Sequence, residues 1–266
     1  MATEAVSGWT PPPRIASATA RRALWAGVVL YGVLAVVTLD VDPTRIAEGL
    51  ARGGAFFGGW LRPDFTTRWT DIRAGLLESL AMTAVSTVAG LMIAIPLGLG
   101  AARNLAPGPV YAAARGVLAV SRAFHEIIVA IVFVAMFGFG PFAGVVTLVV
   151  GSVGFLGKLL AEAIEEIDPA PLEALTAVGA PWGSRVVFGV LPQVMPRVLG
   201  LALYRLDINF RESAVIGLVG AGGIGATLTT AFGRYEFESV SSILILMIAM
   251  VFAAEVVSVR LRRALL

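Results

Sequence analysis

Ionisable side chains interrupt the apolar run at residues 198–219, and they are the groups in this chain best suited to bind a charged ligand. Two of them are arginines, Arg205 and Arg211. A guanidinium donates two parallel hydrogen bonds, which suits a phosphate or phosphonate group. Charges at membrane depth are costly and usually face a cavity or a partner. The run therefore predicts either an anion path or a set of ion pairs that only hold helices together.

Spacing assigns these charges to different roles. Asp207 and Arg211 lie four positions apart with the acid first, so we expect an intramembrane ion pair. Arg205 has no acid three or four positions away, only Asn209, and Glu212 lies seven positions on. We therefore expect the charge of Arg205 to be free to meet an anion.

A glycine-rich segment follows this run. Gly220, Gly222 and Gly225 satisfy G-x-G-x-x-G, but an apolar span precedes them instead of a strand, and the next acids come too early for a dinucleotide site. We expect unwound backbone at Gly220, Gly222 and Gly223 to line a path or gate, where its N–H groups could meet an anion. Close helix packing is the alternative.

Composition argues against catalysis by this chain. Its 266 residues include one histidine and no cysteine, which excludes thiolate and multi-histidine metal sites. No serine motif stands near His125, and no G-x-x-x-x-G-K-S/T sequence occurs for binding ATP. We expect neither a catalytic nor a metal site, His125 as a packing residue, and Glu126 paired with Arg122 four positions earlier.

The chain is 58% hydrophobic and only 14% charged, whereas soluble proteins carry about a quarter charged residues. This composition predicts an all-α membrane protein. Six runs are near the length that a bilayer requires, at about 23–39, 76–101, 116–137, 142–160, 198–219 and 240–260. The third and fourth are joined by a tight glycine-proline turn at 138–141.

Arginine placement predicts the orientation. Arginines collect on the tail, between the second and third runs, in the loop at 161–197 and at the end, so both termini should be cytoplasmic. The expected parts are a cytoplasmic tail at 1–22, a first span with an external segment at 23–75, and a core at 76–266. The external segment is expected to hold an interfacial helix anchored by Trp60 and Trp69. The first run favours a retained anchor over a cleaved signal peptide.

The loop at 161–197 predicts two short helices joined at a glycine. Asp168 suits a helix cap, Pro169 the first helical position and Gly179 a left-handed terminal residue. A surface helix lying on lipid is the alternative. The acids that approach the loop would be repelled by an anionic leaflet, so a protein partner is favoured.

Several segments carry a family resemblance. They are Glu173-Ala174…Gly179…Leu191-Pro192, the turn from Gly138 to Gly144, Leu203 to Asn209, and Gly217 to Gly225. From about Leu76 to its end the chain resembles the permease subunit of phosphonate/phosphate-type ABC importers, within the binding-protein-dependent transport superfamily. It departs at Gly189, where the superfamily often has isoleucine, and at Leu175, which replaces an alanine.

The resemblance implies a type I ABC importer permease fold with a cytoplasmic coupling helix-turn-helix. It implies import of a phosphorus oxyanion by alternating access, with ATP and Mg bound by partner ATPase subunits and no cofactor on this chain. Expected partners are those ATPases, an external substrate-binding protein, a second permease copy or paralogue, and lipid of the cytoplasmic membrane. The alternatives are an amino-acid permease of the methionine type and a standalone channel.

The resemblance also assigns residues to roles. The expected ATPase-coupling residues are Glu173, Ala174, Gly179, Trp182, Leu191 and Pro192. The substrate-path residues are expected instead from the intramembrane charges and the glycine break, and they are Arg205, Asn209, Arg211, Gly220, Gly222 and Gly223.

Overall fold

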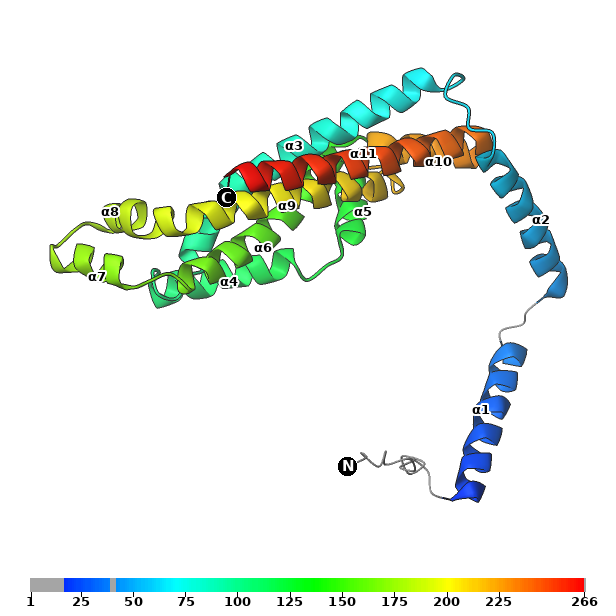
Figure 1. The fold of residues 1–266 in the computed structure, drawn as a ribbon, viewed down its shortest axis with the longest axis horizontal. Coiled ribbons are helices and arrows are strands. Elements are labelled where there is room, and N and C mark those ends of the chain that lie inside the picture. Colours follow the sequence, from blue (N-terminus) through cyan, green and yellow to red (C-terminus); the bar gives the residue numbers. More distant parts are fainter. Residues whose placement is uncertain (1–16, 39–41, 266) are drawn as a thin grey trace, which may run out of the picture. The chain divides into compact units, whose positions relative to one another are not determined.

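The computed structural model describes residues 17–38 and 42–265, and these residues form helices and turns without a strand (Figure 1). The helices are α1 (Ala18–Thr38), α2 (Pro43–Trp60), α3 (Trp69–Gly100), α4 (Gly108–Ser121), α5 (Glu126–Phe137), α6 (Pro141–Glu165), α7 (Ala170–Ala177), α8 (Trp182–Ser184), the π-helix η1 (Arg185–Val190), α9 (Leu191–Gly217), α10 (Gly223–Gly233) and α11 (Phe237–Leu265). The chain divides into two compact units, one ending at Ala55 and the other beginning at Phe56. The first 16 residues of the expected tail lie outside the described residues.

Five helical segments are long and apolar enough to cross a membrane, and a bent pair of helices makes a sixth possible span. The five lie at Ala18–Thr38, Trp69–Gly100, Pro141–Glu165, Trp182–Gly217 and Phe237–Arg260. The all-α membrane class expected from composition is thus confirmed. The second span is longer than expected, because α3 already begins at Trp69.

The span expected at 116–137 is present as a bent pair of helices, α4 and α5, whose axes differ by 88°. The amides of Arg122 and Ala123 donate to Ala119 and Val120 at 3.2 and 3.1 Å, which tightens and ends α4. His125 is extended, at φ −66 and ψ 141, and its Nδ1 accepts from the amide of Ile127 to begin α5. Polar side chains that cap helix ends therefore interrupt an otherwise apolar run.

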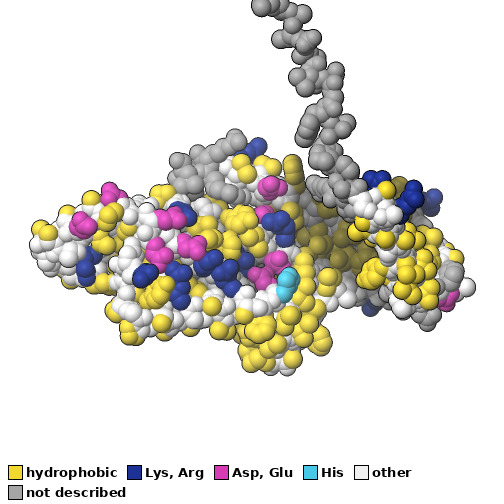
Figure 2. Space-filling model, turned by 90° about the horizontal axis from the view of Figure 1, so that it is seen from below, with side chains coloured by type: hydrophobic (Ala, Val, Ile, Leu, Met, Phe, Trp, Pro, Cys, Tyr) yellow, Lys and Arg dark blue, Asp and Glu magenta, His cyan; other side chains and the backbone are white. Residues whose placement is uncertain are grey.

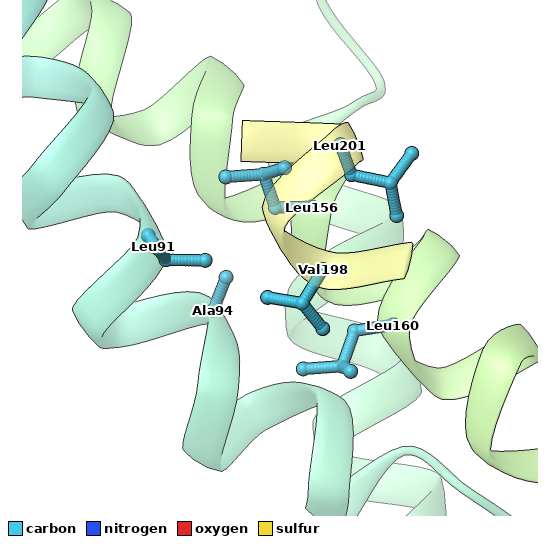
Figure 3. A pocket seen from close by; sticks show the side chains of 6 residues that line it. All are labelled: Leu91, Ala94, Leu156, Leu160, Val198 and Leu201. Carbon is cyan, nitrogen blue, oxygen red and sulfur yellow. The ribbon is translucent and has the colours of Figure 1, made fainter. Parts of the chain in front are cut away.

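The pair α3 and α6 forms the centre of the second unit, and small residues allow their close contact. A Cβ on Gly98 would lie 2.8 Å from Leu160, and a Cβ on Gly157 would lie 2.6 Å from Leu118 of α4. Small residues let membrane helices pack closely where the hydrophobic effect does not drive them together. Apolar side chains of α3, α6 and α9 meet beside this contact around a cavity of only ≈ 10 Å³ (Figure 3), lined by Leu91, Ala94, Leu156, Leu160, Val198 and Leu201.

The segment expected to hold an interfacial helix does contain a helix, α2, which ends at Trp60, while its place at a membrane interface stays a prediction. The last residues of α2 belong to the second unit, in which the Phe56 ring lies 5.8 Å from Phe232 and 5.5 Å from Phe237. Arg68, just before α3, pairs with Glu236, just before α11, with Nη2 3.0 Å from Oε1. These contacts fasten the α2–α3 turn to the α10–α11 turn.

The short helix α10 was not expected from the sequence. It begins at Gly223, and Gly220, Gly222 and Gly223, with φ values of +91, +79 and +71, turn the chain back after α9. Within the second unit α10 lies at the end opposite to α7 and α8 (Figure 1). The glycine segment and the loop at 161–197, the predicted coupling loop, thus occupy opposite ends of the bundle.

Candidate functional site

The loop at 161–197 folds into the expected pair of short helices. Its first helix, α7, begins at Ala170, one residue later than expected, and Asp168 Oδ1 accepts from the Ala170 amide at 3.0 Å. Asp168 therefore still caps the helix, from one position further out. The second helix, α8, begins at Trp182 after the extended Pro181 and continues through η1 into α9.

Gly179 terminates α7 in the left-handed conformation that the sequence predicts, at φ +73. The amide of Gly179 donates to Thr176 and the amide of Ala180 to Leu175, both at 3.0 Å. These bonds satisfy the last carbonyls of the helix. A Cβ at Gly179 would meet nothing within 4 Å, so backbone conformation alone favours glycine here.

Gln193 holds the two ends of the loop together, and sequence reasoning missed it. Its Oε1 accepts from the Asp168 amide at 3.0 Å, while its Nε2 donates to the Gly189 carbonyl at 2.7 Å. A glutamine one position after the Leu-Pro pair gives no sequence signal for a partner 25 residues away. Its hydrogen bonds therefore connect the start of α7 to the start of α9.

The two departures from the family pattern, Leu175 and Gly189, lie next to each other in this part of the loop. A Cβ on Gly189 would lie 3.2 Å from the Cδ1 atoms of Leu172 and Leu175. The larger leucine at 175 is accommodated because position 189 has no side chain. The two departures thus form a compensating pair.

The outer surface of the loop is exposed and mixed in character. Glu173 and Ala174 are exposed, Trp182 is 50% exposed and Val178 is 79% exposed. A cleft of ≈ 640 Å³ beside α7 is lined by Glu165, Glu173, Arg185 and five other residues. Pro192 is exposed, whereas Leu191 packs on a buried cluster. Of the six predicted coupling residues, Glu173, Ala174, Gly179 and Trp182 lie along this surface, and Leu191 and Pro192 form its base.

Charged side chains tie the neighbouring loops to this end of the bundle. Glu165 Oε1 accepts from the Arg103 amide and from Arg115 Nη2, both at 2.8 Å, and Arg197 pairs with Glu166. Figure 2 shows acidic and basic side chains in a band that runs from the α7–α8 end toward the histidine, with hydrophobic side chains on either side.

The band leads to a second cleft, of ≈ 440 Å³, at the bend between α4 and α5. Arg205 lies in its wall with a side chain only 4% exposed. Its Nη2 donates to Glu126 Oε1 at 2.7 Å and its Nε to Ser152 Oγ at 3.0 Å. The expectation that Arg205 lacks an acidic partner is wrong, because Glu126 comes from another helix. The expected Arg122–Glu126 pair is wrong for the same reason.

Gly151 of α6 makes room for this ion pair. A Cβ there would lie 2.7 Å from Arg205 Nη2 and still closer to Glu126 Oε1. Phe155, one turn later, places its ring 5.6 Å from the Arg205 guanidinium carbon, a distance suited to a cation–π contact. The cleft therefore depends on three helices meeting at one point, α5, α6 and α9.

Asn209 is buried in a polar cluster that joins α3, α6 and α9. Its Nδ2 donates to Thr87 Oγ1 and Ser152 Oγ at 2.9 Å, and to Ser86 Oγ at 3.3 Å. Asn209 is 0% exposed and is not among the residues that line the cleft. The structure places it as a helix-joining residue that reaches Arg205 only through Ser152.

The predicted intramembrane ion pair is confirmed: Arg211 Nη2 lies 2.8 Å from Asp207 Oδ2. Arg211 lies away from the Arg205 cleft and borders an apolar pocket of ≈ 200 Å³ next to α10 and α11. The structure therefore does not bring the two arginines of α9 to one site.

The three predicted path glycines are closely packed. A Cβ on Gly222 would lie 2.8 Å from Pro141, a Cβ on Gly220 would collide with the Phe139 ring, and the Gly223 amide already donates to Glu78 Oε1 at 2.8 Å. The expectation of a free N–H for a substrate anion is wrong for Gly223, since a carboxylate of this chain occupies that place. Close packing accounts for these glycines.

Metal chemistry finds no support in the described residues, among which no three His, Cys, Asp or Glu side chains are grouped to hold an ion. His125 instead serves as the cap of α5 and borders the cleft.

Comparison with known proteins agrees with this geometry. Residues 94–266 match the family described as "Binding-protein-dependent transport system inner membrane component". The chain is 40% identical over 230 residues to the phosphate-import permease protein PhnE of Mycolicibacterium smegmatis, covering 85% of this chain but 43% of that protein. It is 40% identical to the phosphite transport system permease protein PtxC of Stutzerimonas stutzeri, over 89% of this chain and 86% of that one.

Solved structures point the same way. An inward-facing form of the MetNI methionine ABC transporter superposes with a TM-score of 0.65 at 28% identity, covering 73% of this chain and 96% of that chain. The two chains therefore share a fold over this part of the molecule. The chain belongs to the family of binding-protein-dependent transport system inner membrane components.

Proposed function

We propose that this chain is the membrane-spanning permease subunit of an ATP-driven importer of a phosphorus oxyanion: phosphonate, phosphate or phosphite. The observation that carries the proposal is its similarity to phosphite permeases over nearly its whole length, at 40% identity to PtxC and 37% identity to the putative HtxC, both from Stutzerimonas stutzeri. The match to the phosphate-import permease covers only part of that longer protein.

The coupling loop supports a role in transmitting force. Its two short helices are joined at left-handed Gly179 and fixed at their base by Gln193, so a push on the exposed surface of α7 moves α9 with it. In this proposal ATP and Mg bind to partner ATPase subunits, each of which docks on one such loop. Two permease subunits, identical or paralogous, then alternate between inward- and outward-facing forms. The chain itself carries no cofactor.

The proposed placement is the cytoplasmic membrane with both termini and the coupling loop inside, following the arginine distribution. An external substrate-binding protein delivers the anion at the opposite end of the bundle, where α10 lies. The buried guanidinium of Arg205 is the proposed substrate-path group, reached when its cleft opens to the path.

A methionine-type permease is the second candidate, favoured by the likeness to MetNI. The D-methionine permease protein MetI of Vibrio cholerae is 27% identical over 69% of this chain, well below the phosphite permeases. A standalone channel leaves the rigid, exposed coupling loop without a purpose.

Two measurements test this proposal. The tagged chain, produced with the ATPase and binding protein of its own transport system, should co-purify with the ATPase. Calorimetry on the binding protein should detect phosphate, phosphite or a phosphonate and not methionine. A binding protein selective for methionine would instead support a methionine-type permease. Failure of the ATPase to associate would favour a standalone channel.

A further inference from the structure

The cleft at the bend between α4 and α5 contains two carboxyl groups, and Arg205 pairs with only one. Glu126 and Glu212 both line it, and Glu126 Oε1 is the acceptor of the Arg205 bond. The Oε2 atom of each is buried without a hydrogen-bond partner among the described residues. Buried acceptors are nearly always satisfied in native proteins. These two atoms therefore mark a place where a donor is expected.

The two carboxyl groups do not satisfy each other, since no hydrogen bond joins them and each Oε2 atom stays without a partner among the described residues. An ionised carboxylate contains only acceptors, so two of them offer each other no donor. Each buried oxygen is therefore open to a donor that enters the cleft.

The same cleft offers donors to an anion. Arg205 uses Nε and Nη2, and no hydrogen bond among the described residues uses its Nη1. Arg122 lines the cleft as well, as does His125. The two arginines of the cleft offset its two carboxyl groups, so the cleft has no excess of negative charge to repel an anion.

We propose that this cleft binds a protonated phosphorus oxyanion, with Arg205 donating to a P–O⁻ oxygen and Glu212 accepting from the P–OH group. The proposal rests on the function proposed above and names the group that selects the substrate. Near neutral pH, phosphate and phosphonate carry both P–O⁻ and P–OH. Sulfate has a similar shape but no hydroxyl, so it would leave the acceptor unsatisfied and meet its negative charge.

The test uses the purified complex of this chain with its ATPase subunits, without the binding protein, so that selectivity comes from the permease. Thermal midpoints are measured against increasing inorganic phosphate and, separately, sulfate, because a ligand that binds the folded state raises the midpoint. We expect phosphate to stabilise the complex at lower concentrations than sulfate. In Glu212→Gln the preference should fall about tenfold, the change expected when one hydrogen bond to a charged group is lost. Glutamine keeps the size and adds a donor that sulfate can use.

Glu162→Gln is the matched control, since Glu162 pairs with Lys158 on α6 and does not line the cleft. It should retain the phosphate preference. Equal preference in Glu212→Gln and wild type, or no phosphate effect on wild type, would overturn the proposal. Uptake by the complete reconstituted transporter distinguishes a failure of the site assignment from a failure of the proposed function. If it takes up phosphate while Glu212→Gln keeps its preference, only the site assignment fails; if it takes up no phosphorus oxyanion, the proposed function fails.

Discussion

Arg205 is a buried guanidinium whose partners come from two other helices. Removing one member of a buried pair leaves an uncompensated charge and costs about 3–5 kcal/mol, so we expect loss of Glu126 or Arg205 to destabilise the fold, apart from any effect on the proposed transport. The Asp207–Arg211 pair could be predicted from sequence because four-residue spacing on a helix is local geometry. The Arg205–Glu126 pair is separated by 79 positions and depends on how α5 and α9 cross. The spacing of residues along the sequence does not predict how these two helices cross.

The room that Gly151 leaves for this pair gives a prediction at the residue scale. Gly151→Ala would place a Cβ 2.7 Å from Arg205 Nη2, so we expect a loss of about 1–3 kcal/mol, the usual cost of overpacking. Thermal unfolding of the purified protein in detergent measures it.

The matched control for that variant is Gly116→Ala on α4. A Cβ at Gly116 meets nothing within 4 Å, so this variant should be neutral or stabilising by up to about 1 kcal/mol through helix propensity. Equal effects of the two variants would mean that helix propensity, and not the space beside the ion pair, decides stability at Gly151.

The coupling loop is the element in which local sequence signals were most informative. The cap at Asp168 and the left-handed Gly179 follow from residue preferences that act within one helix turn. The 88° bend between α4 and α5 did not, because apolar content continues on both sides of it and a hydropathy pattern cannot register a change of direction. The short helix α10 was missed for another reason, because the glycines at its start also fit a nucleotide-binding pattern.

Gly179→Val provides the prediction for this element. At φ +73 a β-branched residue is strained, at a cost of at least about 1–2 kcal/mol, although there is space for the side chain. We expect the variant to insert in the membrane but to lose coupled uptake. In the comparison variant Gly183→Ala, the added Cβ has open space and no positive φ, and uptake should persist. Normal uptake by Gly179→Val would show that the α7 terminus tolerates remodelling.

The contact between the α2–α3 and α10–α11 turns predicts a pH effect. The hydrogen bond from Arg68 lowers the pKa of Glu236 below its ordinary value of 4.5. A carboxyl group whose pKa falls on folding stabilises the fold above its unfolded pKa and loses that contribution as pH drops through the folded value. The contact should therefore hold near neutral pH and weaken only below 4.5.

Glu236→Gln isolates this effect. The free energy of unfolding of the variant and of the wild type is measured at a series of pH values. As pH falls below 4.5 the wild type should lose the stability that this pair contributes, and the variant should show no such loss. The wild-type profile as a whole includes other carboxyl groups, among them Asp64, whose pKa is lowered by hydrogen bonds from Thr66 and Thr67. Parallel profiles for the two proteins would contradict a stabilising role of the Arg68–Glu236 pair.

At the scale of the whole molecule, composition was sufficient to predict a multi-span helical membrane protein, and arginine placement predicts which end faces the cytoplasm. Five spans with a bent sixth agree closely with six expected runs. Within the second unit, α7–α8 and α10 lie at opposite ends (Figure 1), so the proposed orientation assigns the loop at 161–197 and the glycine turn to different sides of the membrane. The sequence indicated Arg205 as a candidate but not the partners that surround it, because the walls of the charged cleft come from the α4–α5 bend, α6 and α9.

The orientation can be tested by labelling, because the native chain has no cysteine. Asp64→Cys should react with an impermeant thiol reagent from outside intact cells, and Val178→Cys only after the cytoplasmic side is opened. Both positions are exposed or partly exposed in the structure. Reaction of the cysteine at position 64 only from the cytoplasmic side would invert the proposed topology.

The central claim, an ATP-coupled permease for a phosphorus oxyanion, is tested most directly by uptake into proteoliposomes containing this chain, its ATPase subunits and its binding protein. The account predicts accumulation of phosphate, phosphite or a phosphonate that requires internal ATP, the binding protein and an intact coupling loop. Accumulation that proceeds without ATP, or that occurs for methionine and for none of these oxyanions, would contradict it.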